Sequence, residues 1–216
     1  MKALQGAVII ACCLAIRPPG QLVSSQASAV SSSSSAHSGA AASLKQDMRK
    51  LWTDHVVWTR DYVIAAIGDR PDAQAAANRL MKNQEAIGDA VATFYGEPAG
   101  QELTIFLKEH IRIAAELVKA AKAGDKAAQQ QADRRWRQNA TSIADFLSGV
   151  NPYWPRETLV ALMRRHLATT TNEVVARLNQ DWDTDVRAFD EVYEHALEMA
   201  DALTEGIVKQ FPDKFT

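Results

Sequence analysis

The chain of 216 residues is nearly balanced in charge, with 24 Lys and Arg against 26 Asp and Glu. A net charge of −2 argues against a dedicated nucleic-acid-binding protein, which would carry a basic excess. Hydrophobic residues make up 47% of the chain, which is enough for a globular core, and there are only 10 Gly and 7 Pro. Because Ala also recurs throughout, this composition favours an all-α fold.

The N-terminal segment has the features of an export signal. A basic start at Met1-Lys2 precedes an apolar run over residues 6–16, which has signal-peptide length and is too short to span a bilayer. Ala27-Ser28-Ala29 then matches a small-x-small cleavage site. We therefore expect residues 1–29 to be a signal peptide and the protein to be periplasmic or secreted, with no transmembrane helix in the mature chain. The alternative is a lipobox with a lipid anchor on Cys12.

The rest of the chain divides into a tether and one domain. Residues 30–43 are rich in Ser and Ala, and we expect a disordered tether there. Residues 44–216 are long enough to build one domain around a single core. Three histidines recur in this domain at separations of 55 and 56 residues: His55, His110 and His166. Apolar residues stand seven, four and three positions before each of them, so each histidine lies on the core-facing stripe of an amphipathic helix.

A second helical pattern follows each histidine across a turn. Its polar member is in turn Asn83, Asn139 and His195. The turns lie midway, at Gly68-Asp69, Gly124-Asp125 and Gln180-Asp181. The pattern predicts an all-α fold of six helices, arranged as three repeated antiparallel hairpins in one bundle. The repeats would span about 44–99, 100–154 and 155–216.

Residues equidistant from the turn of an antiparallel hairpin lie level with one another. We therefore expect three facing pairs, namely His55 with Asn83, His110 with Asn139, and His166 with His195. In one interpretation each amide satisfies a buried imidazole and fixes the register of its hairpin. In the other, the hairpins gather about one axis and the six residues form a polar layer that binds a metal, haem or a small polar ligand. Sequence alone does not choose between a bundle and an open stack of hairpins.

The third pair differs because both of its members titrate. Two imidazolium ions side by side would repel each other, so either one ring is neutral or a metal bridges them. Glu191 and Glu198 lie on the same helix face as His195 and would complete a ligand set with His166 and His195. The alternative is that both glutamates are solvated surface charges. The sequence leaves the cofactor unidentified, with a metal ion as one candidate.

Catalytic motifs are missing from the sequence. It contains no Glu-x-x-His, Cys-x-x-Cys-His, His-Glu-x-x-His, Gly-x-Ser-x-Gly or P-loop. The segment Asp181–Asp185 contains Asp-x-Asp twice, a spacing found at the metal sites of nucleotide-sugar glycosyltransferases. Because this segment opens the last predicted helix, we interpret its carboxylates as helix-capping groups.

Several segments resemble a family of exported bacterial helical proteins without an established activity. They are Trp52-x-x-His-Val-x-Trp58-Thr-Arg60, Asn83-Gln84-x-x-Ile-Gly88, Phe94-Tyr-Gly-Glu-Pro-Ala-Gly100, Asn151-Pro-x-Trp-Pro155 and Gln210-Phe-Pro-Asp-Lys-Phe215. Members are sometimes labelled glycosyltransferase or acetylglutamate kinase, and both activities need a nucleotide-binding architecture that a six-helix chain lacks. The resemblance implies export and a helical fold, and it transfers no catalytic residue.

These observations predict a non-catalytic, exported helical bundle that acts as a binding or envelope-interaction module. Its partner would be a small ligand or an envelope protein. The alternative is a metal- or haem-binding protein, or a small enzyme, that uses the buried His and Asn layer.

Overall fold

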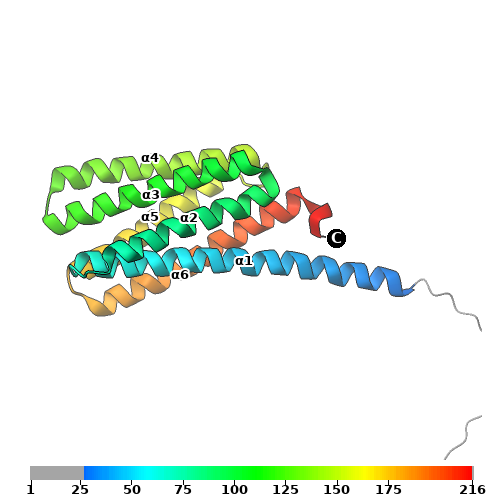
Figure 1. Ribbon diagram of the computed structural model, residues 1–216, viewed down its shortest axis with the longest axis horizontal. Coiled ribbons are helices and arrows are strands. Elements are labelled where there is room, and N and C mark those ends of the chain that lie inside the picture. Colours follow the sequence, from blue (N-terminus) through cyan, green and yellow to red (C-terminus); the bar gives the residue numbers. More distant parts are fainter. Residues whose placement is uncertain (1–26, 216) are drawn as a thin grey trace, which may run out of the picture.

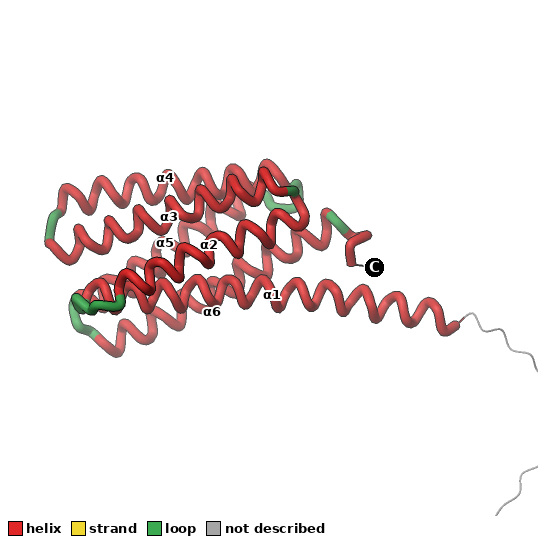
Figure 2. Tube along the Cα trace, viewed as in Figure 1, coloured by secondary structure: helices red, strands yellow, loops and turns green. Residues whose placement is uncertain are grey.

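The computed structural model describes residues 27–215, with side chains from residue 39 onward. The described chain forms six α-helices and no strand, which confirms the all-α prediction. The helices are α1 (Ala27–Ile67), α2 (Ala73–Tyr95), α3 (Glu97–Ala123), α4 (Lys126–Val150), α5 (Arg156–Leu178) and α6 (Trp182–Gln210), followed by the short 3-10 helix η1 (Pro212–Phe215). Figure 2 shows the short loops that join the helices at the two ends of the bundle.

The N-terminal predictions concern residues that lie mostly outside the described part of the chain. Residues 1–26, with most of the predicted signal peptide and Cys12, lie outside the described residues. Helix α1 continues through residues 30–43, where the sequence predicted a disordered tether. Alanine has the highest helix propensity of all residues, which favours this extension. Figure 1 shows that the N-terminal end of α1 projects beyond the bundle.

The three predicted turns occur where the chain can adopt a left-handed backbone. Gly124 closes α3 with a φ of 69°, which costs glycine nothing. Asp69 and Gln180 have φ values of 53° and 58°, and Asp is among the residues that tolerate this region. Each predicted hairpin turn therefore reverses the chain at the expected residues.

Two aspartates cap the helices that follow these turns. The side chain of Asp125 accepts a hydrogen bond from the backbone N–H of Ala128 at 3.0 Å. The side chain of Asp181 accepts one from the backbone N–H of Thr184 at 3.2 Å. Both contacts satisfy a donor that the first turn of a helix leaves unpaired. The capping interpretation of Asp181 is therefore confirmed.

The helices close into a ring. Each helix packs against its neighbour in the chain, and α6 returns to pack against α1. Figure 1 shows α1 and α6 along one edge of the bundle and α3 and α4 along the other. A closed ring surrounds a single interior, so the open stack of hairpins is excluded. The apolar residues seven and three positions before each central histidine are all buried in this interior: Met48, Trp52, Leu103, Leu107, Leu159 and Met163.

Glycine permits the close approach of α2 and α3. A Cβ placed on Gly100 would lie 2.6 Å from the carbonyl oxygen of Gly88 and 2.6 Å from Cβ of Ala92. We expect Gly100→Ala to lower the free energy of unfolding by about 1–3 kcal/mol, because the two helices must separate. In the matched variant Gly149→Ala, the new methyl group meets nothing within 4 Å on an exposed face of α4.

Gly149→Ala should raise the stability by about 0.4–1 kcal/mol through the entropy of the unfolded chain. Urea unfolding of both variants checks the contrast, and equal effects would contradict the close approach.

Candidate functional site

The six residues of the predicted polar layer are all buried. None of His55, Asn83, His110, Asn139, His166 and His195 is more than 8% exposed. The ring of His166 lies 5.8 Å from the ring of His55 and 5.8 Å from the ring of His110, measured between centroids. Ring closure of the bundle therefore brings three imidazoles from different hairpins together in its interior.

His110 and Asn139 face each other as predicted. Nδ1 of His110 lies 2.7 Å from Oδ1 of Asn139, and Nδ2 of Asn139 donates to the carbonyl oxygen of Phe106 at 3.1 Å. Because the Asn139 amide uses its N–H groups on that carbonyl, its oxygen faces the ring and Nδ1 of His110 is the donor. Nε2 of His110 is then a buried acceptor, and it has no hydrogen-bond partner among the described residues.

The amide that contacts His55 belongs to Gln84, the residue after the predicted Asn83. Nδ1 of His55 lies 3.2 Å from Nε2 of Gln84, and Gln84 also donates to Oδ1 of Asn83 at 3.1 Å. Gln84 is fully buried and was not among the residues predicted for the polar layer. The available signal was its position four residues after Leu80, which places it on the same buried stripe of the helix.

The two histidines of the third predicted pair make different contacts. Nε2 of His195 lies 2.9 Å from the carbonyl oxygen of Leu162, and that ring nitrogen must donate because a carbonyl only accepts. The ring of His166 instead meets those of His55 and His110. The facing of His166 and His195 stays a prediction.

The same backbone contact occurs in all three hairpins. The second helix donates a side-chain N–H to the carbonyl located four residues before the central histidine of the first. The donors and acceptors are Asn83 to Leu51 at 2.9 Å, Asn139 to Phe106 at 3.1 Å, and His195 to Leu162 at 2.9 Å. Each of these hydrogen bonds joins the two helices of one hairpin at the level of the polar layer. This supports a structural role for the layer in setting the register of each hairpin.

The three central imidazoles are held neutral at pH 7. Burial lowers the pKa of His55 to about 4, electrostatic coupling to the titration of His110 lowers it further, and the Asn83 side chain has the opposite effect. Burial also lowers the pKa of His110 to about 4, against the opposing effect of Asn139. The pKa of His166 falls well below its usual value, first through burial and then through repulsion by the other histidines. A positive charge in this layer is therefore strongly disfavoured.

The predicted metal ligands do not gather around one point. Glu191 and Glu198 are both exposed. Oε2 of Glu198 accepts from Arg165 at 2.6 Å and lies 3.3 Å from Nδ1 of His195. Within residues 27–215, no group of three or more His, Cys, Asp or Glu side chains is placed to hold a metal ion. The metal site at His166, His195, Glu191 and Glu198 stays a prediction.

The polar layer separates two spaces inside the bundle. On the side of the chain termini is an enclosed cavity of about 40 Å³, lined by His55, His110 and His166 together with apolar side chains. On the side of the three hairpin turns is an open cleft of about 650 Å³. The cleft lies between α3 and α4 on one side and α1 and α5 on the other. In Figure 1 the α3–α4 turn stands apart from the other two turns at this end.

The cleft has apolar walls, polar groups at its mouth and two polar side chains at its floor. Its apolar lining residues include Val63, Leu80, Ile111, Leu117, Val118, Val174 and Leu178. Lys122 and Lys126 stand at the mouth, on either side of the turn at Gly124. Trp136 and Thr170 are buried at the floor, each about one helical turn from the polar layer. This lining offers apolar contact and a small number of hydrogen bonds.

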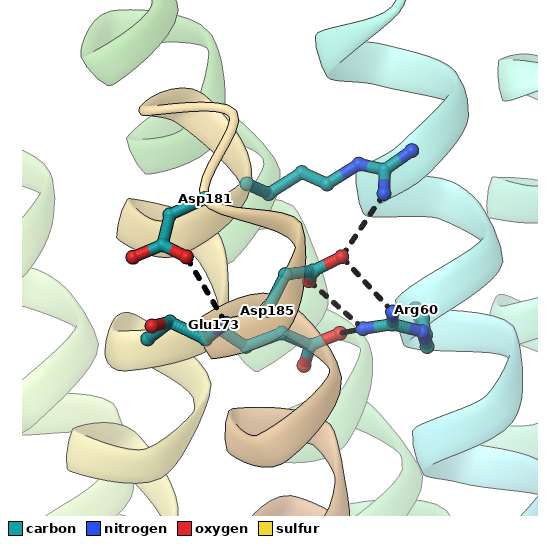
Figure 3. Close-up of polar contacts among 6 residues, drawn as sticks. Arg60, Glu173, Asp181 and Asp185 are labelled. Atoms are coloured by element: carbon teal, nitrogen blue, oxygen red, sulfur yellow. Dashed lines mark hydrogen bonds and ion pairs between the residues drawn. The ribbon is translucent and has the colours of Figure 1, made fainter.

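A buried charged cluster joins α1, α5 and α6 next to the wall of the cleft (Figure 3). Arg60 on α1 donates to Oε1 of Glu173 on α5 at 2.7 Å, and to both carboxylate oxygens of Asp185 on α6 at 3.0 Å. Arg177 donates to Asp185 as well, at 3.0 Å. Glu173 and Asp185 are 1% and 2% exposed, so their charges depend on the two arginines.

The prediction that the carboxylates of the segment Asp181–Asp185 are helix-capping groups is wrong for Asp185, which is buried and accepts from Arg60 and Arg177. Burial raises the pKa of Glu173 to about 7, and its hydrogen bond and charge interaction with Arg60 oppose that rise. Oε2 of Glu173 has no hydrogen-bond partner among the described residues. The carboxyl group of Glu173 therefore titrates near neutral pH.

Comparisons of the chain with protein-family models, curated proteins and solved structures found no match. None of the helices within residues 27–215 combines the length and the apolar character needed to cross a bilayer.

Proposed function

We propose that this protein is a binding module for a small, largely apolar molecule, which it holds in the cleft between α3–α4 and α1–α5. The observation that carries the proposal is the cleft itself, with a volume of about 650 Å³ and mainly apolar walls. Ligand sites in proteins typically enclose about 300–1,000 Å³ and combine an apolar lining with a few polar groups. The proposed location, outside the cytoplasm, rests on the signal-like N-terminal sequence alone.

The size of the central cavity favours the cleft over the histidine layer as the binding site. A volume of about 40 Å³ holds no more than a few water molecules and no organic ligand or haem. The polar layer then has a structural role beneath the floor of the cleft. It joins the hairpins through its hydrogen bonds to backbone carbonyls and closes the inner end of the cleft.

Binding of the neutral fluorophore N-phenyl-1-naphthylamine tests the proposal. We expect saturable binding at one site per chain, with an increase in fluorescence as the probe leaves water. In the variant Ala121→Phe, a large ring would enter the cleft from the half-buried position of Ala121 on α3. We expect its affinity for the probe to fall by about tenfold or more, because the ring occupies ligand volume.

Ala123→Phe provides the matched control. Ala123 lies two residues further along α3, is exposed and does not line the cleft. Its affinity should equal that of the wild-type protein, and circular dichroism should show that both variants are folded. The proposal fails if the probe does not bind saturably, or if the two variants bind it equally well.

A further inference from the structure

Two side chains at the floor of the cleft bury a polar atom without a partner. Nε1 of Trp136 and Oγ1 of Thr170 have no hydrogen-bond partner among the described residues, and the two side chains are 3% and 7% exposed. Buried polar groups in proteins are nearly always hydrogen-bonded, and an unpaired one costs free energy that a partner would recover. Both residues line the cleft, so a molecule in the cleft is a candidate partner.

Thr170 is an exception among its neighbours. The hydroxyl of a threonine in a helix usually donates a hydrogen bond to the backbone carbonyl four residues earlier. Thr169 does so with Arg165 at 3.1 Å, and Thr171 does so with Leu167 at 2.7 Å. Thr170 lies between them, is buried like Thr169, and makes no such bond.

The two unpaired atoms come from adjacent helices at one level of the bundle. Trp136 is three residues before Asn139 on α4, and Thr170 is four residues after His166 on α5. These separations place both side chains about one helical turn from the polar layer, on the cleft side. Helices α4 and α5 pack against each other. The Trp136 ring also lies 5.2 Å from the neutral ring of His110.

On the basis of the proposed function, we infer that the ligand is an apolar molecule with an uncharged carbonyl or hydroxyl group at one end, bound with that end at Trp136 and Thr170. The indole N–H only donates, so the ligand atom that it meets must accept. The hydroxyl of Thr170 both donates and accepts. A carbonyl oxygen accepts from both side chains, and an alcohol oxygen accepts from one and donates to the other.

The distribution of charge in the cleft disfavours an ionised head group at the floor. The charged residues that line the cleft are Lys122, Lys126 and Asp133. Lys122 lies twelve residues beyond His110 along α3, which places it near the mouth. The imidazoles beneath the floor are neutral, so they offer no counter-charge to a carboxylate. A buried carboxylate without a partner is costly, whereas a carbonyl loses little by leaving water once it is hydrogen-bonded.

Competition against N-phenyl-1-naphthylamine with four compounds of eight carbons tests the inference. The compounds are octan-2-one, octan-1-ol, n-octane and octanoate. We expect the ketone and the alcohol to bind about tenfold more tightly than the alkane and the carboxylate. Thr170→Val keeps the shape of the side chain and removes its hydroxyl, so it should cancel most of the advantage of the ketone and leave octane binding unchanged. Trp136→Phe should act in the same direction, and Thr169→Val should leave all four affinities unchanged.

A stability measurement separates recognition from a structural role of Thr170. In the ligand-free protein, Thr170→Val removes an unpaired buried hydroxyl and should raise the urea midpoint. Thr169→Val removes a paired hydroxyl and should not raise it. A ligand-recognition residue therefore gives higher stability together with weaker binding of the ketone. A residue needed only for packing would not give that combination.

The possible failures are distinct. Equal affinities for ketone and alkane in the wild-type protein would overturn the inference and leave the proposed function intact. The same conclusion would follow if the ketone kept its advantage in both Thr170→Val and Trp136→Phe. It would also follow if octanoate bound most tightly, because its head group would then lie at the lysines. If neither the probe nor any of the four compounds binds, the proposed function itself fails.

Discussion

Between pH 7 and pH 5, His55 and His110 are each expected to remove about 2 kcal/mol from the free energy of unfolding. The pKa of both rings is lowered to about 4 in the fold, whereas it is 6.5 for an unperturbed histidine. Between about pH 6.5 and pH 4, the unfolded chain therefore binds more protons at these histidines than the folded one. Their contribution to the free energy of unfolding decreases as the pH is lowered through this window. His166 acts in the same direction because its pKa is also lowered.

Glu173 acts in the opposite direction. Its pKa is raised to about 7, so the folded protein takes up a proton on acidification before the unfolded chain does. This uptake offsets about 2 kcal/mol of the loss between pH 7 and pH 5. Comparison of variants that share Glu173 removes its contribution from the measurement.

Urea unfolding of wild-type protein and His110→Gln at pH 7 and pH 5 checks the histidine contribution. The glutamine retains a donor for Asn139 and does not titrate, so this variant should lose about 2 kcal/mol less than the wild-type protein on acidification. In the control Glu173→Gln, the compensating proton uptake is absent, and the loss should be about 2 kcal/mol larger than in wild type. Equal losses in wild type and His110→Gln would show that the His110 ring is not held neutral by burial.

Replacing Arg60 with Met is expected to lower the free energy of unfolding by about 3–5 kcal/mol at pH 7.5. Methionine retains the apolar stem of the side chain but cannot neutralise the carboxylates of Glu173 and Asp185, both of which are buried. It also loses the stacking of the guanidinium over the Phe189 ring, whose centroid lies 4.6 Å away. Arg177 alone would remain to neutralise Asp185.

Arg49→Met is the matched control for the loss of an arginine ion pair. Arg49 pairs with Asp201 at 2.6 Å, but both side chains are partly exposed, so the variant should lower the stability much less than Arg60→Met does. Urea unfolding at pH 7.5 and pH 5.5 provides a second check. The effect of Arg60→Met should shrink at the lower pH, because Glu173 can then take up a proton. An effect of Arg60→Met as small as that of Arg49→Met would mean that the cluster does not stabilise the fold.

The sequence determined the helices, the turns and the buried position of the histidines. Each of these features depends on local periodicity: a stripe of apolar residues with a period near 3.6, interrupted by residues that tolerate a left-handed turn. The facing of His110 and Asn139 followed from equal distances to the turn at Gly124, because an antiparallel hairpin is symmetric about its turn. The internal repeat stays a prediction.

Contacts between hairpins could not be read from this pattern. The meeting of the His55, His110 and His166 rings depends on closure of the ring of helices through α6 and α1. Which ring the His166 imidazole meets is therefore decided by the packing of the hairpins against one another, and periodicity within a single helix does not specify that packing.

The charged cluster and the cleft were decided by the tertiary structure alone. Arg60 is separated in the chain from Glu173 by 113 residues and from Asp185 by 125, and nothing in the spacing of charges distinguishes them from solvated residues. The cleft opens at the end of the bundle where the α3–α4 turn stands apart from the other two turns, and Trp136 and Thr170 lie at its floor. Helical periodicity specifies which face of each helix is apolar, whereas the distance between two such faces is set by the packing of all six helices together.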